Sequence, residues 1–430
     1  MEINSLYAHY LEHPSVETDS RKIKKNDIFF ALKGPNFNGN KYAQQALKDG
    51  AAYCVVDEET GVDDSRIIKV TDCLETLQLL AKKHREQFSI PFVAITGSNG
   101  KTTNKELVHA VLSSSYKTAT TVGNLNNHIG IPLTILRIKA DAEIAVIEMG
   151  ANHQKEIEGY CIYTKPTHGM ITNCGKAHLE GFGGEEGVRK GKGELFDYLR
   201  KTNGTAFIFS DYDYLLEMSA GISKRITYGT GNATLTGEEI AGTDDELLRV
   251  KICNGAAINE IKTQLVGGYN LPNVLAAVCI GKAFRVEDEK IKTALENYIP
   301  SNSRSQLIEK DGNRIILDAY NANPSSMKAA IENFEKIPGD KKILILGGMM
   351  ELGNDSLHEH ALLVKLIAKN QWYKVALVGN DYKDLPAGFL HFNNSKEVNS
   401  WYNEQDIKEA HILIKGSRSM QMEKVLGEVV

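Results

Sequence analysis

The segment TGSNGKTT, residues 96–103, constrains the fold of this chain more than any other feature. It follows the apolar run Phe92–Ile95 and precedes a helical pattern that begins at about Thr102. Glycines let successive backbone N–H groups converge on an anion, a lysine reaches the β- and γ-phosphates, and a hydroxyl binds magnesium. A strand, a glycine loop and a helix in this order therefore predict a phosphate-binding loop for ATP or a close relative.

We expect the whole loop to contact the nucleotide, through Gly97, Ser98, Asn99, Gly100, Lys101, Thr102 and Thr103. The strict pattern G-x-x-x-x-G-K-[ST] is not met, because Ala94 stands at its first glycine position. An ordinary Gly/Asn turn that caps a helix is the alternative interpretation, but the strand before the loop and the helix after it favour phosphate binding.

Composition excludes several classes of protein. The 430 residues, 42% apolar and 24% charged, are typical of a globular protein of several domains, and a net charge of -5 argues against nucleic acid as a partner. The first residues lack the basic and apolar regions of a secretory signal, and no apolar run predicts membrane insertion. Six scattered cysteines without a C-x-x-C pair indicate reduced thiols in the cytoplasm and make a zinc site improbable.

Three α/β regions follow one another along the chain. The first, residues 1–88, has strand patterns at Asp27–Leu32 and Ala51–Asp57, and helical patterns at Lys41–Asp49 and Thr71–Arg85. The second, residues 89–300, alternates continuous apolar strands with helices, which indicates a mostly parallel sheet covered on both faces. Within it, the stretch Thr227–Val266 alternates like short antiparallel strands, and a helix is expected at Leu271–Phe284.

The third region, residues 301–430, repeats a strand–loop–helix pattern and predicts a Rossmann-like α/β domain. Ligands of open parallel sheets bind at the carboxyl ends of the strands, where this region places Asp318 and the pair Lys415-Gly416. The expected strands are Ile315–Asp318, Lys342–Leu346, Val375–Val378 and His411–Ile414.

Two residues outside the loop are candidate magnesium ligands. Glu148 ends the apolar run Ile144–Ile147, where a carboxylate could complete the shell of a nucleotide-bound magnesium ion, although it could also cap a helix. His178 follows the next expected strand. A loop histidine is more often a surface residue or a hydrogen-bonding residue than a ligand, so the case for His178 depends on its lying at the same sheet edge as Glu148.

Lys192 lies in the helical pattern Glu185–Leu199, on the same face as Val188 and Leu195. It stands between Gly191 and Gly193, and each glycine in a helix interior costs about 1 kcal/mol relative to alanine. An inward lysine between two glycines suggests close approach to another group. The alternative interpretation, which we weigh equally, is that the aliphatic part of the Lys192 side chain is buried while its ammonium reaches the surface.

A set of ordered motifs resembles the Mur ligases of peptidoglycan synthesis, and the resemblance covers essentially the whole chain. Its N-terminal part also resembles the uridine-nucleotide domain of that family, through the segment DSRKIKKNDIFFALKGPNFNGN. Tyr269 stands where the family usually has a histidine, Gly348 where an acidic residue is common, and residues 36–40 read NFNGN where an Asp-Gly-His type run is typical. The motifs, in chain order, are TGSNGKTT, GNLNNHIGIP, EMGANH, ITNCGKAHLEGFG, KGELF, DAYNANP, MMELG and KGSR.

The resemblance implies roles for individual residues. Lys101 and Thr102 would hold ATP and a first magnesium ion, with Glu148 in its shell, and His178 would bind a second ion together with Lys192 as an N-carbamoylated lysine. Of these residues, Lys101, Glu148, His178 and Lys192 would form the catalytic set. Further ATP contacts would come from Asn273, Arg304 and Asp318, and substrate contacts from Ser20, Arg21, Lys33, Asn126, Asn127, Asn321 and Asn323.

The branch of the family that the motifs resemble most implies the substrates UDP-N-acetylmuramoyl-tripeptide and D-alanyl-D-alanine, joined by a cytoplasmic monomer with ATP, magnesium and carbon dioxide as lysine carbamate. The tripeptide carboxylate would form an acyl phosphate, which the dipeptide amine would attack. Other members, such as the third-residue-adding enzyme or a folylpolyglutamate synthase, are the nearest alternatives. A P-loop kinase and a nucleotide-binding module without chemistry are more distant ones.

Overall fold

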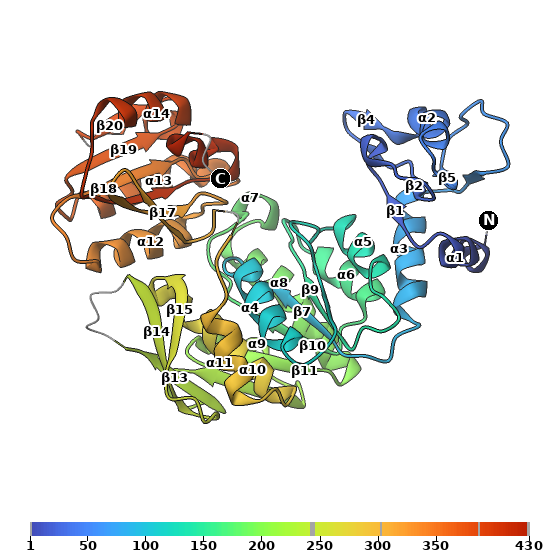
Figure 1. Ribbon diagram of the computed structural model, residues 1–430, viewed down its shortest axis with the longest axis horizontal. Helices are drawn as coiled ribbons and strands as arrows, with labels where there is room; N and C mark the ends of the chain where they lie inside the picture. Colours follow the sequence, from blue (N-terminus) through green and yellow to red (C-terminus); the bar gives the residue numbers. More distant parts are fainter. Residues whose placement is uncertain (1, 241–245, 302, 386–387, 428–430) are drawn as a thin grey trace.

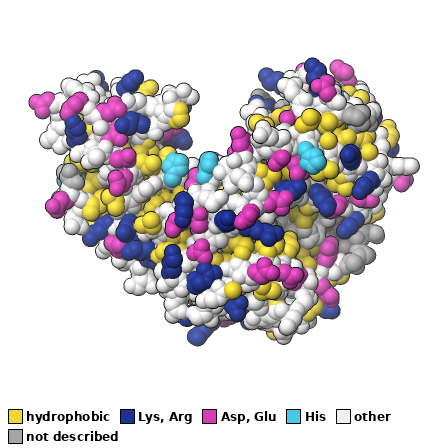
Figure 2. All heavy atoms as spheres, turned by 180° about the vertical axis from the view of Figure 1, so that it is seen from behind, with side chains coloured by type: hydrophobic (Ala, Val, Ile, Leu, Met, Phe, Trp, Pro, Cys, Tyr) yellow, Lys and Arg dark blue, Asp and Glu magenta, His cyan; other side chains and the backbone are white. Residues whose placement is uncertain are grey.

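The computed structural model describes residues 2–240, 246–301, 303–385 and 388–427 (Figure 1). Three α/β units follow the chain, as the sequence predicted, and the C-terminal and N-terminal units stand as two arms above the central one. Figure 2, seen from behind, shows the surface hollowed between these arms. The boundaries after residues 88 and 300 remain predictions.

The N-terminal unit is built on a four-stranded sheet in which every pairing is parallel. The strands expected at 27–32 and 51–57 are confirmed as its two central strands, which are shorter than the apolar patterns. In spatial order the strands are β1 (Val16–Glu17), β2 (Ile28–Phe30), β5 (Tyr53–Val56) and β6 (Ile67–Lys69). The short antiparallel pair β3 (Lys33–Gly34) and β4 (Phe37–Asn38) and the helices α1 (Ile3–Glu12), α2 (Ala43–Lys48) and α3 (Cys73–Arg85) complete the unit.

A nine-stranded sheet forms the middle of the central unit. Its strands lie in the order β15 (Ile261–Val266), β14 (Leu247–Asn254), β13 (Leu235–Glu239), β12 (Lys224–Gly229), β11 (Thr205–Phe209), β10 (His168–Ile171), β7 (Phe92–Thr96), β9 (Ile144–Glu148) and β8 (Thr118–Thr120). The pairings from β8 to β13 are parallel, and only β13–β14 and β14–β15 are antiparallel.

The antiparallel expectation for Thr227–Val266 was therefore wrong for its first strand, because β12 pairs in parallel with both of its neighbours. Alternation of apolar and polar residues reports which face of a strand is buried and carries no information on the direction of the neighbouring strand. The expected antiparallel pairing is present between β13 and β14 and between β14 and β15, which follow one another along the chain with short connections.

Helices cover both faces of the central sheet (Figure 1). The helix α10 packs closely on α4, the helix that follows the phosphate loop, and is apolar around most of its circumference because it lies in the core. This packing fixes the start of α4 at the edge of the sheet. The helices are α4 (Lys101–Ser113), α5 (Gly130–Leu136), α6 (Glu156–Thr164), α7 (Leu179–Phe182), α8 (Glu185–Thr202), α9 (Asp213–Met218), α10 (Leu271–Ala283) and α11 (Asp288–Glu296).

The C-terminal unit has a six-stranded sheet, parallel except for one edge pairing. The four strands expected there are confirmed, and the two edge strands were missed because they are short or half-exposed. In spatial order the strands are β16 (Gln306–Lys310), β17 (Asn313–Asp318), β21 (His411–Lys415), β18 (Lys342–Gly347), β19 (Lys374–Val378) and β20 (Leu390–Phe392); the helices are α12 (Pro324–Lys336), α13 (Ser356–Ile367) and α14 (Ser395–Glu404). Across all three units, no helix in the described ranges is long and apolar enough to span a bilayer.

Candidate active site

The loop between β7 and α4 requires glycine at two positions. Gly97 has φ 146° and Gly100 has φ 77°, and a Cβ on Gly97 would stand 1.9 Å from Thr172 Oγ1. Thr172 Oγ1 donates to the Asn99 carbonyl at 2.6 Å, and Asn173 Oδ1 accepts the Asn99 amide at 3.0 Å. The residues after β10 thus brace the loop.

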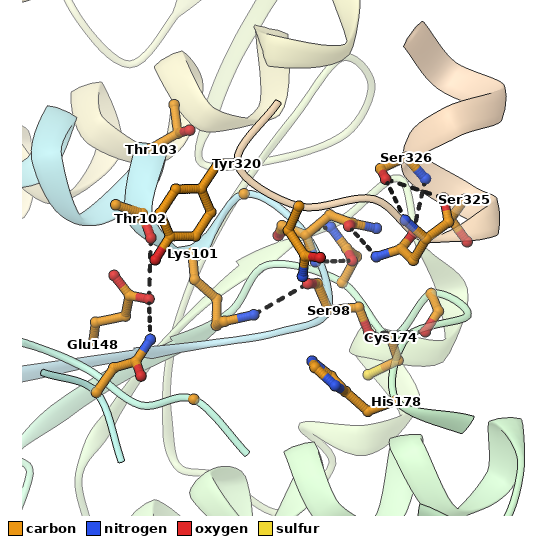
Figure 3. Close-up of a pocket in the computed structure, with 18 of the residues that line it drawn as sticks. Ser98, Lys101, Thr102, Thr103, Glu148, Cys174, His178, Tyr320, Ser325 and Ser326 are labelled. Carbon is orange, nitrogen blue, oxygen red and sulfur yellow. Dashed lines mark hydrogen bonds between the residues drawn. The ribbon is translucent and has the colours of Figure 1, made fainter. Parts of the chain in front are cut away.

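Lys101 is the first residue of α4, and its side chain turns back over this loop (Figure 3). Its Nζ donates to the carbonyls of Gly97 at 2.7 Å and Ser98 at 3.1 Å. Burial lowers the pKa of the Lys101 ammonium, and the negative charge of Glu148 partly opposes that shift. The side chain lies where the loop would present its amides to an anion.

Glu148 ends β9 and is only 1% exposed. Its Oε1 accepts hydrogen bonds from Thr102 Oγ1 at 3.1 Å and Asn126 Nδ2 at 2.7 Å (Figure 3), whereas its Oε2 is buried without a hydrogen-bond partner. A buried carboxylate oxygen without a partner is costly unless a cation or a donor occupies the space beside it. Glu148 and Thr102 therefore fit a magnesium ion, which prefers oxygen ligands and phosphates.

In the described part of the chain, no three His, Cys, Asp or Glu side chains gather into a group that could hold a metal ion by themselves. A cation at Glu148 would accordingly take its other ligands from the Thr102 hydroxyl, water and phosphate oxygens, as is usual for magnesium at nucleotides.

Lys192 is 1% exposed on the inner face of α8, so its ammonium does not reach the surface. Its Nζ donates to the Ala151 carbonyl at 3.0 Å and lies 4.8 Å from the centroid of the Phe182 ring. Burial, followed by the charge of Lys101, lowers the pKa of Lys192 to about 7. The close approach expected at the flanking glycines is to this same ring, because a Cβ on Gly191 would stand 2.4 Å from Phe182 Cε1.

His178 immediately precedes α7 and adopts a left-handed backbone conformation with φ 53°. In the view of Figure 3 it lies across the cavity from Glu148, with Lys101 between them. Its Nδ1 contacts Oε2 of Glu351, a residue of the C-terminal unit. The proximity of the His178 ring holds the pKa of the Glu351 carboxyl below its usual range, although His178 Nδ1 makes no hydrogen bond of good geometry.

These residues surround a cavity of about 700 Å³ between the central and C-terminal units. The cavity collects most of the predicted site residues: Ser98, Asn99, Gly100, Lys101, Thr102, Thr103, Asn126, Asn127, Glu148, His178, Asn273, Arg304, Asp318, Asn321 and Asn323. Gly97 lies beneath Lys101, and Lys192 lies behind Ala151, which is itself part of the cavity wall.

Several of the predicted contact residues also hold the local structure. Asn323 caps α12 in a capping box with Ser326, and its Nδ2 donates to Asn99 Oδ1 at 2.7 Å, so that it joins the two units at the phosphate loop. Asn127 Oδ1 accepts the amides of Ile129 and Gly130 at the start of α5.

The C-terminal unit lines its side of the cavity with charged and aromatic side chains from the ends of β17 and β21 and from the segments beside β16 and β17. Lys415 Nζ donates to Asp318 Oδ2 at 2.5 Å, and the Arg304 guanidinium stacks over the Tyr320 ring at 3.6 Å. Lys415 and Tyr320 were not among the predicted site residues, although Lys415 had been noted at a strand end. Glu351 was missed because its partner His178 lies in another unit.

Ser20, Arg21 and Lys33 lie in the N-terminal unit, away from this cavity. Arg21 is exposed and pairs with Asp19 at 2.8 Å. Lys33 Nζ lies 3.2 Å from Asp57 Oδ1 and 3.3 Å from Glu58 Oε1. These three residues therefore lie outside the cavity that contains the phosphate loop.

Two departures from the family pattern have structural explanations. Tyr269 OH bonds to Ser305 Oγ at 2.9 Å across the two units, so the aromatic residue keeps a polar contact at the cavity wall. A Cβ on Gly348 would stand 3.3 Å from Asp381 Oδ2, so an acidic side chain already lies beside the position where the family has one.

Comparisons with known proteins agree with this architecture. Three models of one family match the chain: the Mur ligase family catalytic domain at residues 14–110, the Mur ligase middle domain at 95–281, and the Mur ligase glutamate ligase domain at 303–418.

The UDP-N-acetylmuramoyl-tripeptide–D-alanyl-D-alanine ligase of Bacillus subtilis is 33% identical over 440 aligned positions that cover 99% of this chain and 95% of that protein. A crystal structure of MurF from Acinetobacter baumannii superimposes with a TM-score of 0.87 at 29% identity, covering 96% of this chain and 92% of that one. The MurF ligase of Thermotoga maritima in complex with ADP also gives a TM-score of 0.87, at 26% identity and 97% coverage of both chains. The chain belongs to the Mur ligase family.

Proposed function

We propose that the chain is an ATP-dependent, ADP-forming ligase that joins D-alanyl-D-alanine to UDP-N-acetylmuramoyl-tripeptide in peptidoglycan synthesis. The observation that carries this proposal is the meeting, in one cavity, of the braced phosphate loop and the unpartnered carboxylate oxygen of Glu148. The full-length similarity to ligases of that name supports the choice of substrates.

The chemistry requires two anions to approach, because the tripeptide carboxylate attacks the γ-phosphate of ATP. Lys101 and the amides of its loop would bind the phosphates, and Glu148 with the Thr102 hydroxyl would hold magnesium. When bound, magnesium supplies positive charge to the transferred group. The amine of the dipeptide then attacks the acyl phosphate, and phosphate leaves from a tetrahedral intermediate.

Acyl phosphates hydrolyse readily, so the reacting atoms must be shielded from water. The C-terminal unit closes one wall of the cavity with Arg304, Asp318, Asn321 and Asn323. We assign Arg304 and Asp318, together with Asn273, to nucleotide binding. The contact of Asn323 with Asn99 supports a role in holding the unit over the loop.

Lys192 and His178 form the second part of the proposed metal site. A buried lysine whose pKa is lowered to about 7 is largely neutral above that pH, and only the neutral amine can combine with carbon dioxide. A carbamate would convert this side chain into an anionic oxygen ligand. The burial of Lys192 supports carbamoylation, and the second magnesium ion belongs to the same proposal.

We assign the uridine-diphosphate end of the substrate to Ser20, Arg21 and Lys33, and its sugar-peptide part to Asn126 and Asn127. We further propose that the protein is a monomer and is located in the cytoplasm. The six cysteines are all free, which suits a reducing compartment. Size-exclusion chromatography with light scattering tests the monomer, because a dimer would double the mass of 47.5 kDa.

Phosphate release tests the reaction directly. ATP, D-alanyl-D-alanine and UDP-muramoyl-tripeptides bearing lysine or diaminopimelate are supplied together and with each component left out. The proposal requires release and a pentapeptide product only when both acceptor and dipeptide are present. Release that needs no dipeptide would indicate a hydrolase, and no release with either tripeptide would refute the assignment.

A further inference from the structure

A second cavity, of about 480 Å³, lies between α3 of the N-terminal unit and α6 of the central unit. These two helices pack against each other, and in Figure 1 α3 runs from the N-terminal unit down to the central one. Three residues, His128, Glu156 and Tyr160, line both this cavity and the one that contains the phosphate loop, so the two spaces adjoin. None of the roles assigned above uses the second cavity.

The shared wall stands close to the reacting groups. Asn126 Nδ2 donates to Glu148 Oε1 at 2.7 Å, and His128 follows Asn126 by two residues. The His128 carbonyl accepts a hydrogen bond from Gln78 Nε2 at 3.1 Å, which holds this segment against α3. In the proposed reaction the attacking carboxylate belongs to the third residue of the acceptor peptide. The side chain of that residue therefore starts within a few bonds of the γ-phosphate and needs a space that adjoins the first cavity.

The middle of the second cavity is apolar. Leu79 of α3 and Ile162 of α6 both line it and are 44% and 56% exposed. The aromatic ring of Tyr160 forms part of the same wall and is 3% exposed. Such surfaces are suited to the aliphatic part of a ligand, because covering them removes apolar area from water.

Charged side chains of both signs surround this apolar middle. Lys82 is half-buried in the wall, and no ion pair in the described part of the chain includes it. The carboxylate one turn further along α3, that of Glu86, pairs with Lys165 at 2.6 Å instead. Glu75 lines the cavity two turns before Lys82, and Glu156 lines it from α6. The arrangement matches a side chain with an aliphatic stem and a zwitterionic end.

We propose that the second cavity receives the side chain of the third residue of the acceptor peptide, and that Lys82 selects a diamino diacid of the diaminopimelate type over lysine. The inference rests on the proposed function. The two amino acids differ in one group, because diaminopimelate carries a carboxylate on the carbon that bears the side-chain ammonium of lysine. Glu75 and Glu156 serve the ammonium that both have, and only the diacid offers a carboxylate to Lys82.

The test compares two acceptors for the full-length protein, UDP-muramoyl-tripeptides that end in diaminopimelate or in lysine. The wild type should have a kcat/KM about fivefold higher with diaminopimelate, because a partly exposed ion pair contributes up to about this factor. Lys82→Gln removes the charge and keeps a polar side chain. It should abolish the preference by raising the KM for the diaminopimelate acceptor.

The matched control is Lys83→Gln, because Lys83 is the next residue of α3, is also half-buried and does not line the cavity. This variant should keep the wild-type preference. Equal efficiency of the wild type with both acceptors, a preference for lysine, or a preference that survives in Lys82→Gln would overturn the proposal. A loss of preference in Lys83→Gln equal to that in Lys82→Gln would overturn it as well.

Binding separates this inference from the proposed function. Calorimetric titration with each tripeptide, in the presence of a non-hydrolysable ATP analogue, requires no turnover. Tighter binding of the diaminopimelate peptide by the wild type, lost in Lys82→Gln, would support the assignment of the cavity. Wild-type protein that forms no product with either acceptor would refute the ligase assignment, whereas product formation with equal affinity for both peptides would refute only the role of Lys82 and its cavity.

Discussion

At the scale of single residues, the unpartnered oxygen of Glu148 leads to a prediction about magnesium. Glu148→Gln keeps an oxygen that can accept the bonds from Thr102 and Asn126 but removes the charge, so the magnesium concentration for half-maximal phosphate release should rise about tenfold or more. Glu143→Gln, immediately before the start of the same strand, is the control because that residue is exposed. An unchanged magnesium dependence in Glu148→Gln would argue against its ligand role.

Lys192 supports a second prediction at this scale. Lys192→Ala should lower phosphate release by about 10²-fold, and formate or acetate should restore part of it by taking the place of the carbamate. The matched control is Lys190→Ala on the same helix, an exposed lysine paired with Glu186, which should have near-normal activity. Near-normal phosphate release by Lys192→Ala would exclude the carbamate.

At the scale of secondary-structure elements, β10 carries a residue that makes the fold sensitive to acid. His168 lies at its start, between the rings of Phe207 and Phe284, and burial lowers its pKa from 6.5 to about 4. The unfolded chain therefore binds more protons than the folded one between these two pH values, and stability falls as the pH falls through this range.

We expect the protonation of His168 to lower the free energy of unfolding by at most about 3 kcal/mol near pH 4. The substitution His168→Phe should abolish this pH-dependent loss of stability. Urea unfolding of both proteins at pH 7.5 and pH 5 measures the difference. The wild type should lose more stability on acidification than the variant. Equal losses would show that His168 does not cause the sensitivity.

Most elements could be predicted from the sequence because buried parallel strands are continuously apolar, as β7, β9 and β18 are. The edge strand β16 could not, because its residues are half-exposed and its polarity resembles that of a loop. For the candidate site, local sequence patterns predicted the positions of Lys101 and Glu148 and the inward orientation of the Lys192 side chain. The partner of His178 was out of reach, because only the docking of two separate units brings Glu351 to it.

At the scale of the whole molecule, a cluster of charged side chains lies between the central and C-terminal units. Glu246, with a side chain 2% exposed, precedes β14 in the central unit, and its Oε1 lies 2.7 Å from His411 Nε2 and 3.4 Å from Arg314 Nε, both in the C-terminal sheet. Glu246→Gln removes the negative charge beside His411 and Arg314 and should weaken docking by roughly 1 kcal/mol, since ion pairs with a partly exposed partner contribute up to about this much.

Small-angle scattering of the ligand-free protein should then show a larger radius of gyration for Glu246→Gln than for the wild type. His411→Gln should act in the same direction, and the double variant should be less than additive because the two residues share one contact. Identical scattering of the wild type and Glu246→Gln would mean that the cluster does not hold the units together.

The amide of Asn323 has a consequence for thermodynamic linkage. One side chain closes the first turn of α12 and also donates to Asn99, so a single hydrogen bond ties a helix of one unit to the loop that would receive the phosphates of another. Coupling free energies are reciprocal. Where this bond persists in the nucleotide complex, a firmer seat of α12 strengthens nucleotide binding, and an occupied loop holds the C-terminal unit to the central unit more firmly by the same factor.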